Sequence, residues 1–394
     1  MSNQGPAISH VNEAQKIFPV GYHKFHKSQV YNYPLNRWYS LGFFKFEDIA
    51  HIGERISTFS DWRTEMEKLT EKAQAENRLM NAAFYYRAAE FYTLNKDQPG
   101  KEFYYDRFID LFYQAVAGES FEKLTVPYGS GYLPILRFKP EGEKIGTLIL
   151  HAGFDAFIEE WYYVMKAIAT QGFEVIGFEG PGQGNVILKQ GIPLDYQWEK
   201  PVKAVLDGLG IEESALFGLS MGGWFCLRAA AFEPRIKHVI ASGHAVEYSR
   251  IPPEFARWMM MFFIKNYREY TARSFQSILD KGQSNMQNWQ TSNLAHITKR
   301  SPLEAFEYSL NLNEENLHCE KVRQNVLYLT GRDDHIIPFK VHAKQVQLLS
   351  NTASLTDRVF TREENAQNHC QIGNIPLMLD VVCDWLKDKQ GKRV

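Results

Sequence analysis

A serine lies between two glycines where an apolar stretch gives way to a helix-like one. Gly218, Ser220 and Gly222 form the pattern G-x-S-x-G within residues 215–225. At a sharp strand-to-helix turn this pattern presents the serine oxygen as a nucleophile, and glycines avoid the collisions that side chains would make. The N–H of Met221, at the helix start, would then face the negative charge that develops during acyl transfer. The alternative is a serine that only caps a helix, so the partners of Ser220 must be found.

A nucleophilic serine needs a histidine that accepts its proton and a carboxylate that orients this histidine. Both follow in the chain order Ser, Asp, His that suits this turn. His369 lies just past a predicted strand, and Asp333 and Asp334 lie on the loop after the preceding strand. The two aspartates compete for the acid role, because a shift of one residue only turns the side chain elsewhere.

Three other histidines lie near these segments. His335 adjoins the acid, His342 falls in the helix predicted after it, and His151 precedes Ser220 in the chain. We interpret all three as structural.

A second N–H donor for the oxyanion is expected from residues 151–161, the loop after the predicted third strand. Gly153 lets the backbone pass close to the substrate, so we expect the N–H of Phe154 to act beside that of Met221. Residues 177–184 are rich in glycine. They lack the lysine and the spacing of a phosphate-binding loop, so we interpret them as a tight turn next to the site.

The type of secondary structure that the sequence predicts changes along the chain. Residues 1–120 show helical spacing without convincing strands, and we interpret them as an N-terminal helical domain. Residues 121–246 and 321–394 contain short apolar runs that alternate with helix-like segments, which is typical of strands buried in a mostly parallel sheet. Residues 247–320 have helical periodicity and no strand signal, which predicts a helical cap insertion. We therefore expect an α/β fold.

Composition limits the class of protein. The 394 residues are 44% hydrophobic and 23% charged with a net charge of −2, which gives no indication of nucleic-acid binding. The four cysteines form no CxxC pair, so we expect free thiols and no zinc site. Residues 1–10 lack a signal peptide, and the apolar run 258–264 is too short to span a bilayer, which favours a cytoplasmic protein with no membrane partner.

The motifs resemble a branch of the α/β hydrolases. This branch contains 2,6-dihydroxypseudooxynicotine hydrolase and the polyketide-shortening hydrolases of pigment and anthraquinone biosynthesis. The resemblance is carried by HAGFDAFIEEW, GFEGPGQG, GLSMGG, GRDDHIIP and the NHC around His369. It covers the chain from about residue 120 and extends to the N-terminal helices. The superfamily pattern G-x-x-D, followed by an apolar pair and proline, selects Asp334 as the acid and leaves Asp333 as a turn residue.

What the resemblance implies is cleavage of a carbon–carbon bond next to a ketone in a β-diketone or polyketide-type substrate, without a cofactor. The substrate would be a small molecule, free or delivered by a synthase or carrier protein, and a homodimer is considered as well. Gly153, Glu247, Tyr248 and Trp258 are the candidate substrate-binding residues. A carboxylesterase acting on small or aromatic esters, a peptidase, and a non-catalytic binding protein on the same scaffold remain as alternatives.

Overall fold

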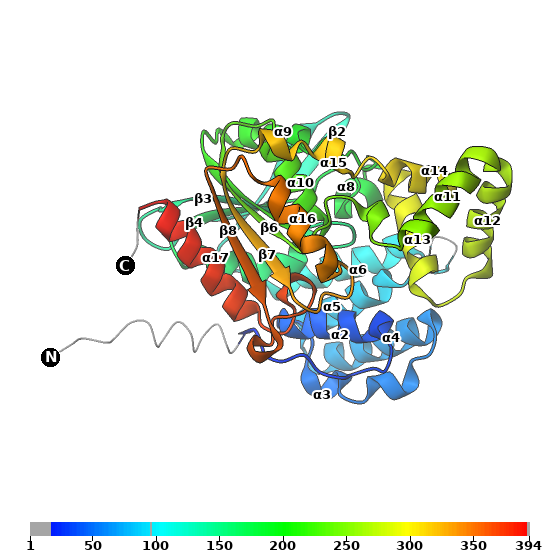
Figure 1. Ribbon diagram of the computed structural model, residues 1–394. Coiled ribbons are helices and arrows are strands. Elements are labelled where there is room, and N and C mark those ends of the chain that lie inside the picture. The colour runs from blue at the N-terminus through cyan, green and yellow to red at the C-terminus, as the bar shows by residue number, and fades with distance from the viewer. Residues whose placement is uncertain (1–16, 95–96, 392–394) are drawn as a thin grey trace.

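An eight-stranded sheet runs through the centre of the computed structural model, which describes residues 17–94 and 97–391 (Figure 1). The strand order is β1-β2-β4-β3-β5-β6-β7-β8. Both antiparallel pairs involve β2, and all other neighbouring strands are parallel. The expected α/β fold with a mostly parallel sheet is confirmed. The strands are β1 Glu122–Tyr128, β2 Gly131–Phe138, β3 Gly146–His151, β4 Phe173–Phe178, β5 Ser214–Leu219, β6 Ile236–Ser242, β7 Asn325–Gly331 and β8 Ser354–Phe360.

Helices cover both faces of the sheet. All six residues of β5 are buried, and because side chains alternate along a strand, Leu216 and Phe217 enter different cores. Phe217 packs in the core that contains α7 and α17, whereas Leu216 packs with α9 and α10. The helices beside the sheet are α7 Tyr162–Ala169, α8 Gly184–Leu188, α9 Glu199–Leu209, α10 Met221–Ala230, α16 His342–Leu348 and α17 Ile375–Lys389.

The N-terminal helices share a core with the sheet. They are α2 Gln29–Ser40, α3 Phe46–Ile49, α4 Phe59–Ala75, α5 Leu79–Phe91 and α6 Lys101–Ala115. The Thr58 hydroxyl and the Asp61 carboxylate cap the first turn of α4 reciprocally, which fixes where this helix begins. One continuous apolar cluster runs from Phe18 through these helices to Leu386 in α17. The domain boundary expected near residue 120 is therefore crossed by packing, and its position stays a prediction.

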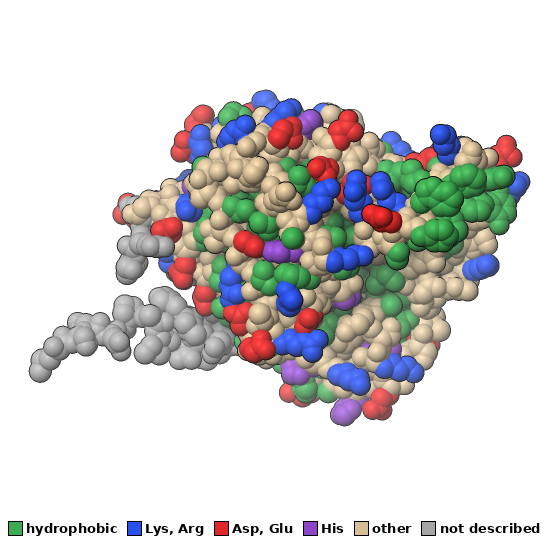
Figure 2. Space-filling model, in the orientation of Figure 1, with side chains coloured by type: hydrophobic (Ala, Val, Ile, Leu, Met, Phe, Trp, Pro, Cys, Tyr) green, Lys and Arg blue, Asp and Glu red, His purple; other side chains and the backbone are tan. Residues whose placement is uncertain are grey.

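The chain between β6 and β7 holds helices and no strand. The α-helices are α11 Glu254–Asn266, α12 Arg268–Lys281, α13 Met286–Thr298, α14 Pro302–Ser309 and α15 Glu314–Leu317. Figure 1 shows α11 to α14 at the right of the view, and Figure 2 shows a group of hydrophobic side chains on the surface there. The indole N–H of Trp289 in α13 donates to the main-chain oxygen of Phe91 at 2.6 Å, which joins this insertion to the N-terminal helices.

The register of the parallel strands brings the predicted site residues to one edge. His151 pairs with Gly218, and Leu219 pairs with Ser242, so the loops after β3, β5 and β6 emerge side by side. Carboxyl ends of parallel strands are where ligands bind in such sheets.

Two expectations concern the chain as a whole. In the described part of the chain no helix is long and apolar enough to cross a membrane, and the four cysteines are buried and free. The expected lack of a signal peptide falls on residues 1–10, outside the described residues, and the cytoplasmic location stays a prediction.

Candidate active site

The turn at Ser220 has the strained geometry that the glycine pattern predicts. Ser220 follows β5 and precedes α10 with φ 58° and ψ −128°, a conformation that is costly for a residue with a side chain. A Cβ on Gly218 would lie 1.9 Å from the carbonyl oxygen of Gly222, so only glycine fits there. The N–H of Ser220 donates to the oxygen of Ser242 at 2.8 Å, which anchors the turn to β6.

The structure brings Ser220, His369 and Asp334 into one hydrogen-bonded series. His369 Nε2 lies 2.9 Å from Ser220 Oγ, and His369 Nδ1 lies 2.7 Å from Asp334 Oδ2. Asp334 follows β7, and His369 opens a short helical turn some residues after β8. Asp334 and His369 are buried, whereas Ser220 is partly exposed. This geometry suits a serine nucleophile, a base and an orienting acid.

The two neighbouring aspartates have different partners. The second oxygen of Asp334, Oδ1, accepts the main-chain N–H groups of Ile336 and Ile337, each at 2.8 Å. Asp333 instead pairs with the exposed guanidinium of Arg362. Only Asp334 of the two contacts the imidazole, so the geometry matches the choice made from the G-x-x-D pattern.

The environment of His369 favours its protonated form. Burial by itself lowers the pKa of this imidazole, but the charge of Asp334, the neighbouring Cys370 and the hydrogen bond to Asp334 raise the pKa well above 6.5. An imidazolium would therefore be stabilised once Ser220 has given up its proton. Gly243 keeps space beside this ring, since a Cβ there would lie 3.1 Å from His369 Cε1.

The other three histidines do not contact Ser220. Burial lowers the pKa of His151 to about 4. Burial and the nearby charge of His369 lower that of His335 to about 4, and its ring packs on Tyr33. His342 hydrogen-bonds Thr330 and Asp357. These contacts fit the structural interpretation.

The loop after β3 lies against the serine turn. A Cβ on Gly153 would come within 2.7 Å of the main-chain nitrogen of Met221, so glycine is needed for this approach. Among the described residues, neither the Phe154 N–H nor the Met221 N–H donates a hydrogen bond within the chain. Both N–H groups are thus free to act on an oxyanion.

Two side chains that the sequence analysis missed hold this loop. Gln183 Nε2 donates to the oxygens of Ala152 and Gly153, at 2.7 Å and 3.0 Å. Asn293 Nδ2, from α13, donates to the oxygen of Phe154 at 3.2 Å. Gln183 lies within the glycine-rich residues 177–184, so their expected position next to the site agrees with this contact.

A buried ion network lies behind the same loop. Arg37 of α2 contacts Asp155 at 2.9 Å and Glu160 at 2.8 Å. Arg87 of α5 contacts Glu160 at 2.9 Å and also donates to the main-chain oxygen of Asp155. Trp38 Nε1 donates to Glu160 at 2.8 Å. Glu160, which we expect from the sequence to cap or pack the following helix, accepts the N–H of Phe157 at 3.0 Å and also joins two N-terminal helices to the loop.

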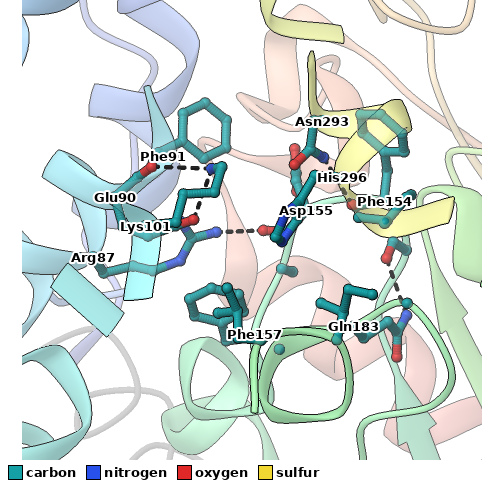
Figure 3. Close-up of a pocket in the computed structure, with 17 residues that line it drawn as sticks. Arg87, Glu90, Phe91, Lys101, Phe154, Asp155, Phe157, Gln183, Asn293 and His296 are labelled. Atoms are coloured by element: carbon teal, nitrogen blue, oxygen red, sulfur yellow. Dashed lines mark hydrogen bonds and ion pairs between the residues drawn. The ribbon is translucent and has the colours of Figure 1, made fainter. Parts of the chain in front are cut away.

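Figure 3 shows a small cavity beside this network. Its walls include Arg87, Asp155 and His296 as well as Gly153 and Phe154 of the loop, but not Ser220. Its volume of about 30 Å³ has room for about one water molecule. The cavity lies behind the loop and is too small for an organic substrate.

The candidate substrate-binding residues lie in different places. Gly153 lies at the site, as described above. Tyr248 is half-buried, and the burial of its hydroxyl together with the nearby Cys370, Tyr328 and Asp334 raises its pKa.

The structure gives Glu247 and Trp258 other contacts or surroundings. Glu247 pairs with Arg250 and Arg257 of its own segment. Trp258 is 61% exposed on α11. The roles of Glu247 and Trp258 in substrate binding stay predictions.

Metal ligands were also considered. In the part of the chain that the structure describes, no three His, Cys, Asp or Glu side chains are grouped so that they could hold a metal ion. A cofactor-independent reaction stays a prediction.

A mostly parallel sheet with a serine, a histidine and an aspartate at the carboxyl ends of its strands defines the α/β-hydrolase class of enzymes. The sequence profile of the family described as alpha/beta hydrolase fold matches residues 146–361, and the chain belongs to this family. Its curated relatives are named as hydrolases.

Two curated relatives are fungal hydrolases. The chain is 28% identical over 269 residues to alpha/beta hydrolase psoB of Aspergillus fumigatus, covering 56% of this chain and 59% of that protein. It is 30% identical over 262 residues to 20-hydroxy-prefusarin hydrolase FUS2 of Gibberella moniliformis, covering 56% of this chain and 61% of that protein. The chain thus spans about three fifths of the length of these relatives.

Solved structures resemble the whole described fold. 2,6-Dihydroxy-pseudo-oxynicotine hydrolase superposes with a TM-score of 0.65 at 20% identity, over 91% of this chain and 97% of that one. AbyA5 superposes with a TM-score of 0.64 at 18% identity, over 98% and 95%. The resemblance inferred from the motifs is confirmed at the level of the fold.

Proposed function

We propose that this chain is a serine hydrolase that cleaves a carbon–carbon bond in a β-diketone or polyketide-type small molecule, free or carried by a synthase. The observation that carries the proposal is the hydrogen-bonded series Ser220–His369–Asp334, with distances of 2.9 Å and 2.7 Å. Further support comes from the resemblance to hydrolases that act on such substrates, and from a curated relative named for 20-hydroxy-prefusarin.

In the first half of the proposed reaction, Ser220 Oγ forms a bond to a substrate carbonyl carbon and its proton passes to His369 Nε2. The resulting oxyanion accepts hydrogen bonds from the N–H groups of Phe154 and Met221. When the carbonyl re-forms, the carbon–carbon bond breaks and its electron pair leaves on carbon. A simple carbanion is too basic to leave, but one next to a second carbonyl is an enolate, which His369 protonates.

In the second half, water gives its proton to His369 and adds to the acyl-Ser220 carbonyl. Collapse of this intermediate returns the proton to Ser220 Oγ and releases a carboxylic acid. Asp334 accepts a hydrogen bond from the Nδ1–H of the imidazole throughout, so that Nε2 remains the atom that takes up and returns the proton. The products are therefore a ketone and an acid, and one water is consumed.

The rival proposal is a carboxylesterase with the same residues in the same roles. An ester needs no second carbonyl, because an alkoxide or phenoxide leaves more readily than a carbanion. The two proposals differ only in the leaving group, so substrate analogues separate them.

Product analysis by mass spectrometry tests the proposal. We expect a β-diketone to yield a shortened ketone and an acid, and a matched isolated ketone to remain intact. Ser220→Ala should lower this activity at least about 1000-fold, whereas Ser274→Ala, on the exposed surface of α12, should not. Hydrolysis of alkyl esters without any cleavage of the diketone would favour the esterase, and full activity in Ser220→Ala would reject both.

A further inference from the structure

Helix α11 is apolar on nearly all sides yet lies at the surface. Residues 258–263 are six consecutive large hydrophobic side chains, each at least 38% exposed, and Ile264 is the only buried residue of the helix. A surface helix normally presents polar residues to solvent, and a helix that is apolar all round is normally buried. Figure 2 shows this apolar surface at the right of the molecule, where Figure 1 places α11 and α12.

The outer side of α11 forms an ordered aromatic row, which we call the α11 row and define as Phe255, Trp258 and Phe262. The ring centroids of Phe255 and Trp258 lie 6.1 Å apart with 25° between the planes, and those of Trp258 and Phe262 lie 5.6 Å apart with 22°. The spacing i, i+3, i+7 places all three rings on one face, as in helices that pack against another helix. Their stacking fixes them before any partner binds, which lowers the entropic cost of association.

The exposed area around this row is large enough for a stable interface. An aromatic side chain buries about 150–250 Å², so nine side chains that are 38% to 70% exposed present on the order of 1000 Å². The largest apolar patch of a typical monomer is about 300–600 Å². One side of a standard protein interface contributes roughly 800 Å². The nine are Phe255, Trp258, Met259, Met260, Met261, Phe262, Phe263, Tyr267 and Tyr270.

The charges beside the row indicate what kind of partner fits. Arg250 and Arg257 both pair with Glu247, at 2.7 Å and 3.0 Å, and Arg268 pairs with Glu307. Glu247 offsets only one of the two arginines that it contacts, so one positive charge remains at this end of the row. A twofold interface places a surface against its own copy, where unpaired like charges would repel. Residues 258–263 carry no charge, so the centre of the row can lie against its own copy without such repulsion.

We propose that α11 and the first turn of α12 form a homodimer interface, in which the α11 row packs against the α11 row of a second copy. Because the contact is isologous, Trp258, at the middle of the row, lies near the twofold axis and meets its equivalent. Tryptophan, tyrosine, phenylalanine and methionine are the residues enriched in such interfaces.

Sedimentation velocity across micromolar concentrations tests the interface. We expect the wild-type chain to sediment at twice its 45.6 kDa mass. The double variant Trp258→Glu, Phe262→Glu should be monomeric, with dissociation constant raised at least about 100-fold. The control Phe103→Glu, on α6 and 41% exposed like Phe262, should remain dimeric. A monomeric wild-type chain, or a dimeric double variant, would overturn the proposal.

Chemical cross-linking adds a measurement that does not depend on a charged variant folding. The four native cysteines are buried, so Trp258→Cys gives one accessible thiol. A short bis-maleimide should join two copies of this variant, whereas Phe103→Cys should give no covalent dimer. Equal cross-linking of both variants would contradict a twofold axis at Trp258. Flotation of the wild-type chain with phosphatidylcholine–phosphatidylserine vesicles, in the absence of dimer, would assign the surface to a membrane instead.

Discussion

Arg37 Nη1 lies 2.9 Å from Asp155 Oδ1, so a helix near the start of the chain is bonded to the loop that carries Phe154. Arg37 is buried, and its guanidinium also contacts Glu160 in the same loop. In a low-dielectric interior the attraction within such an ion pair offsets the cost of desolvation only when the geometry is good. The N-terminal helices therefore help to hold the main chain against Ser220.

The first prediction follows from this contact. In Arg37→Met the loop loses its anchor, and we expect kcat to fall by at least about tenfold, because the Phe154 N–H acts on charge that develops in the transition state. KM should change less, since this interaction is weak in the ground state. Steady-state kinetics on an aryl ester, with circular dichroism to verify folding, gives both numbers.

The exposed pair of Arg362 and Asp333 provides the control. Arg362→Met removes a guanidinium of the same kind at the surface and should leave kcat unchanged. A folded Arg37→Met enzyme with wild-type kcat would show that the loop needs no such anchor.

A second prediction concerns the acid. Asp334→Asn should lower kcat/KM by about 10³–10⁴-fold, because an amide favours the wrong tautomer of His369. In the proposed reaction neutral His369 is the base, so activity should rise as pH passes its pKa, and loss of the Asp334 charge should move this rise to lower pH. Asp333→Asn should have little effect on rate or profile. A pH–rate series for the three proteins measures both effects, and reversed effects would exchange the roles of the two aspartates.

The third prediction compares two glycines with nearly equal positive φ angles. Gly243 has φ +65° and lies against His369, whereas Gly191 has φ +67° and nothing within 4 Å of a built Cβ. Both Gly→Ala variants should lose a similar amount of stability, on the order of 1 kcal/mol, from the left-handed backbone. Only Gly243→Ala should also lower kcat, since its methyl group displaces the imidazole. Thermal melts and kinetics of the pair separate these effects, and equal kcat values would contradict the contact.

A fourth prediction concerns stability and pH. Burial raises the pKa of Glu159 and Glu179, and the nearby charge of Glu159 raises that of Glu179 further. Lys123, Tyr113 and Arg87 face the pair and oppose this effect. In the unfolded chain both carboxyls ionise near 4.5, so across neutral pH the folded state binds more protons. Their contribution to stability is full below pH 4.5 and is lost as pH rises through the folded pKa values.

Glu159→Gln removes one ionisation and keeps an oxygen for the hydroxyl of Tyr113, which donates to Glu159 Oε1 at 3.0 Å. We expect the melting temperature of the wild-type enzyme to fall more between about pH 5 and pH 9 than that of this variant. Calorimetry over this range measures the difference. Parallel curves would mean that Glu159 is ionised in the folded enzyme.

The sequence predicts the sheet because its strands are buried on both faces and read as short apolar runs, as in residues 214–219. It predicts Ser220 and His369 because their chemistry requires a fixed turn and a fixed chain order. It does not reveal Arg37, since a charged residue within a helix looks the same whether it faces solvent or a buried carboxylate. The exposure of Trp258 is hidden for a related reason, because helical spacing tells which residues share a face but not what that face meets.

The single apolar cluster from Phe18 to Leu386 has a consequence for how the chain folds during synthesis. The N-terminal helices leave the ribosome first, but the strands and helix α17 that complete their core come later, the last of them near the end of the chain. Until then their apolar faces stay uncovered, and such nascent chains aggregate readily. The shared core is therefore complete only after α17 has been translated, and a ribosome stalled before residue 375 would carry an incomplete core.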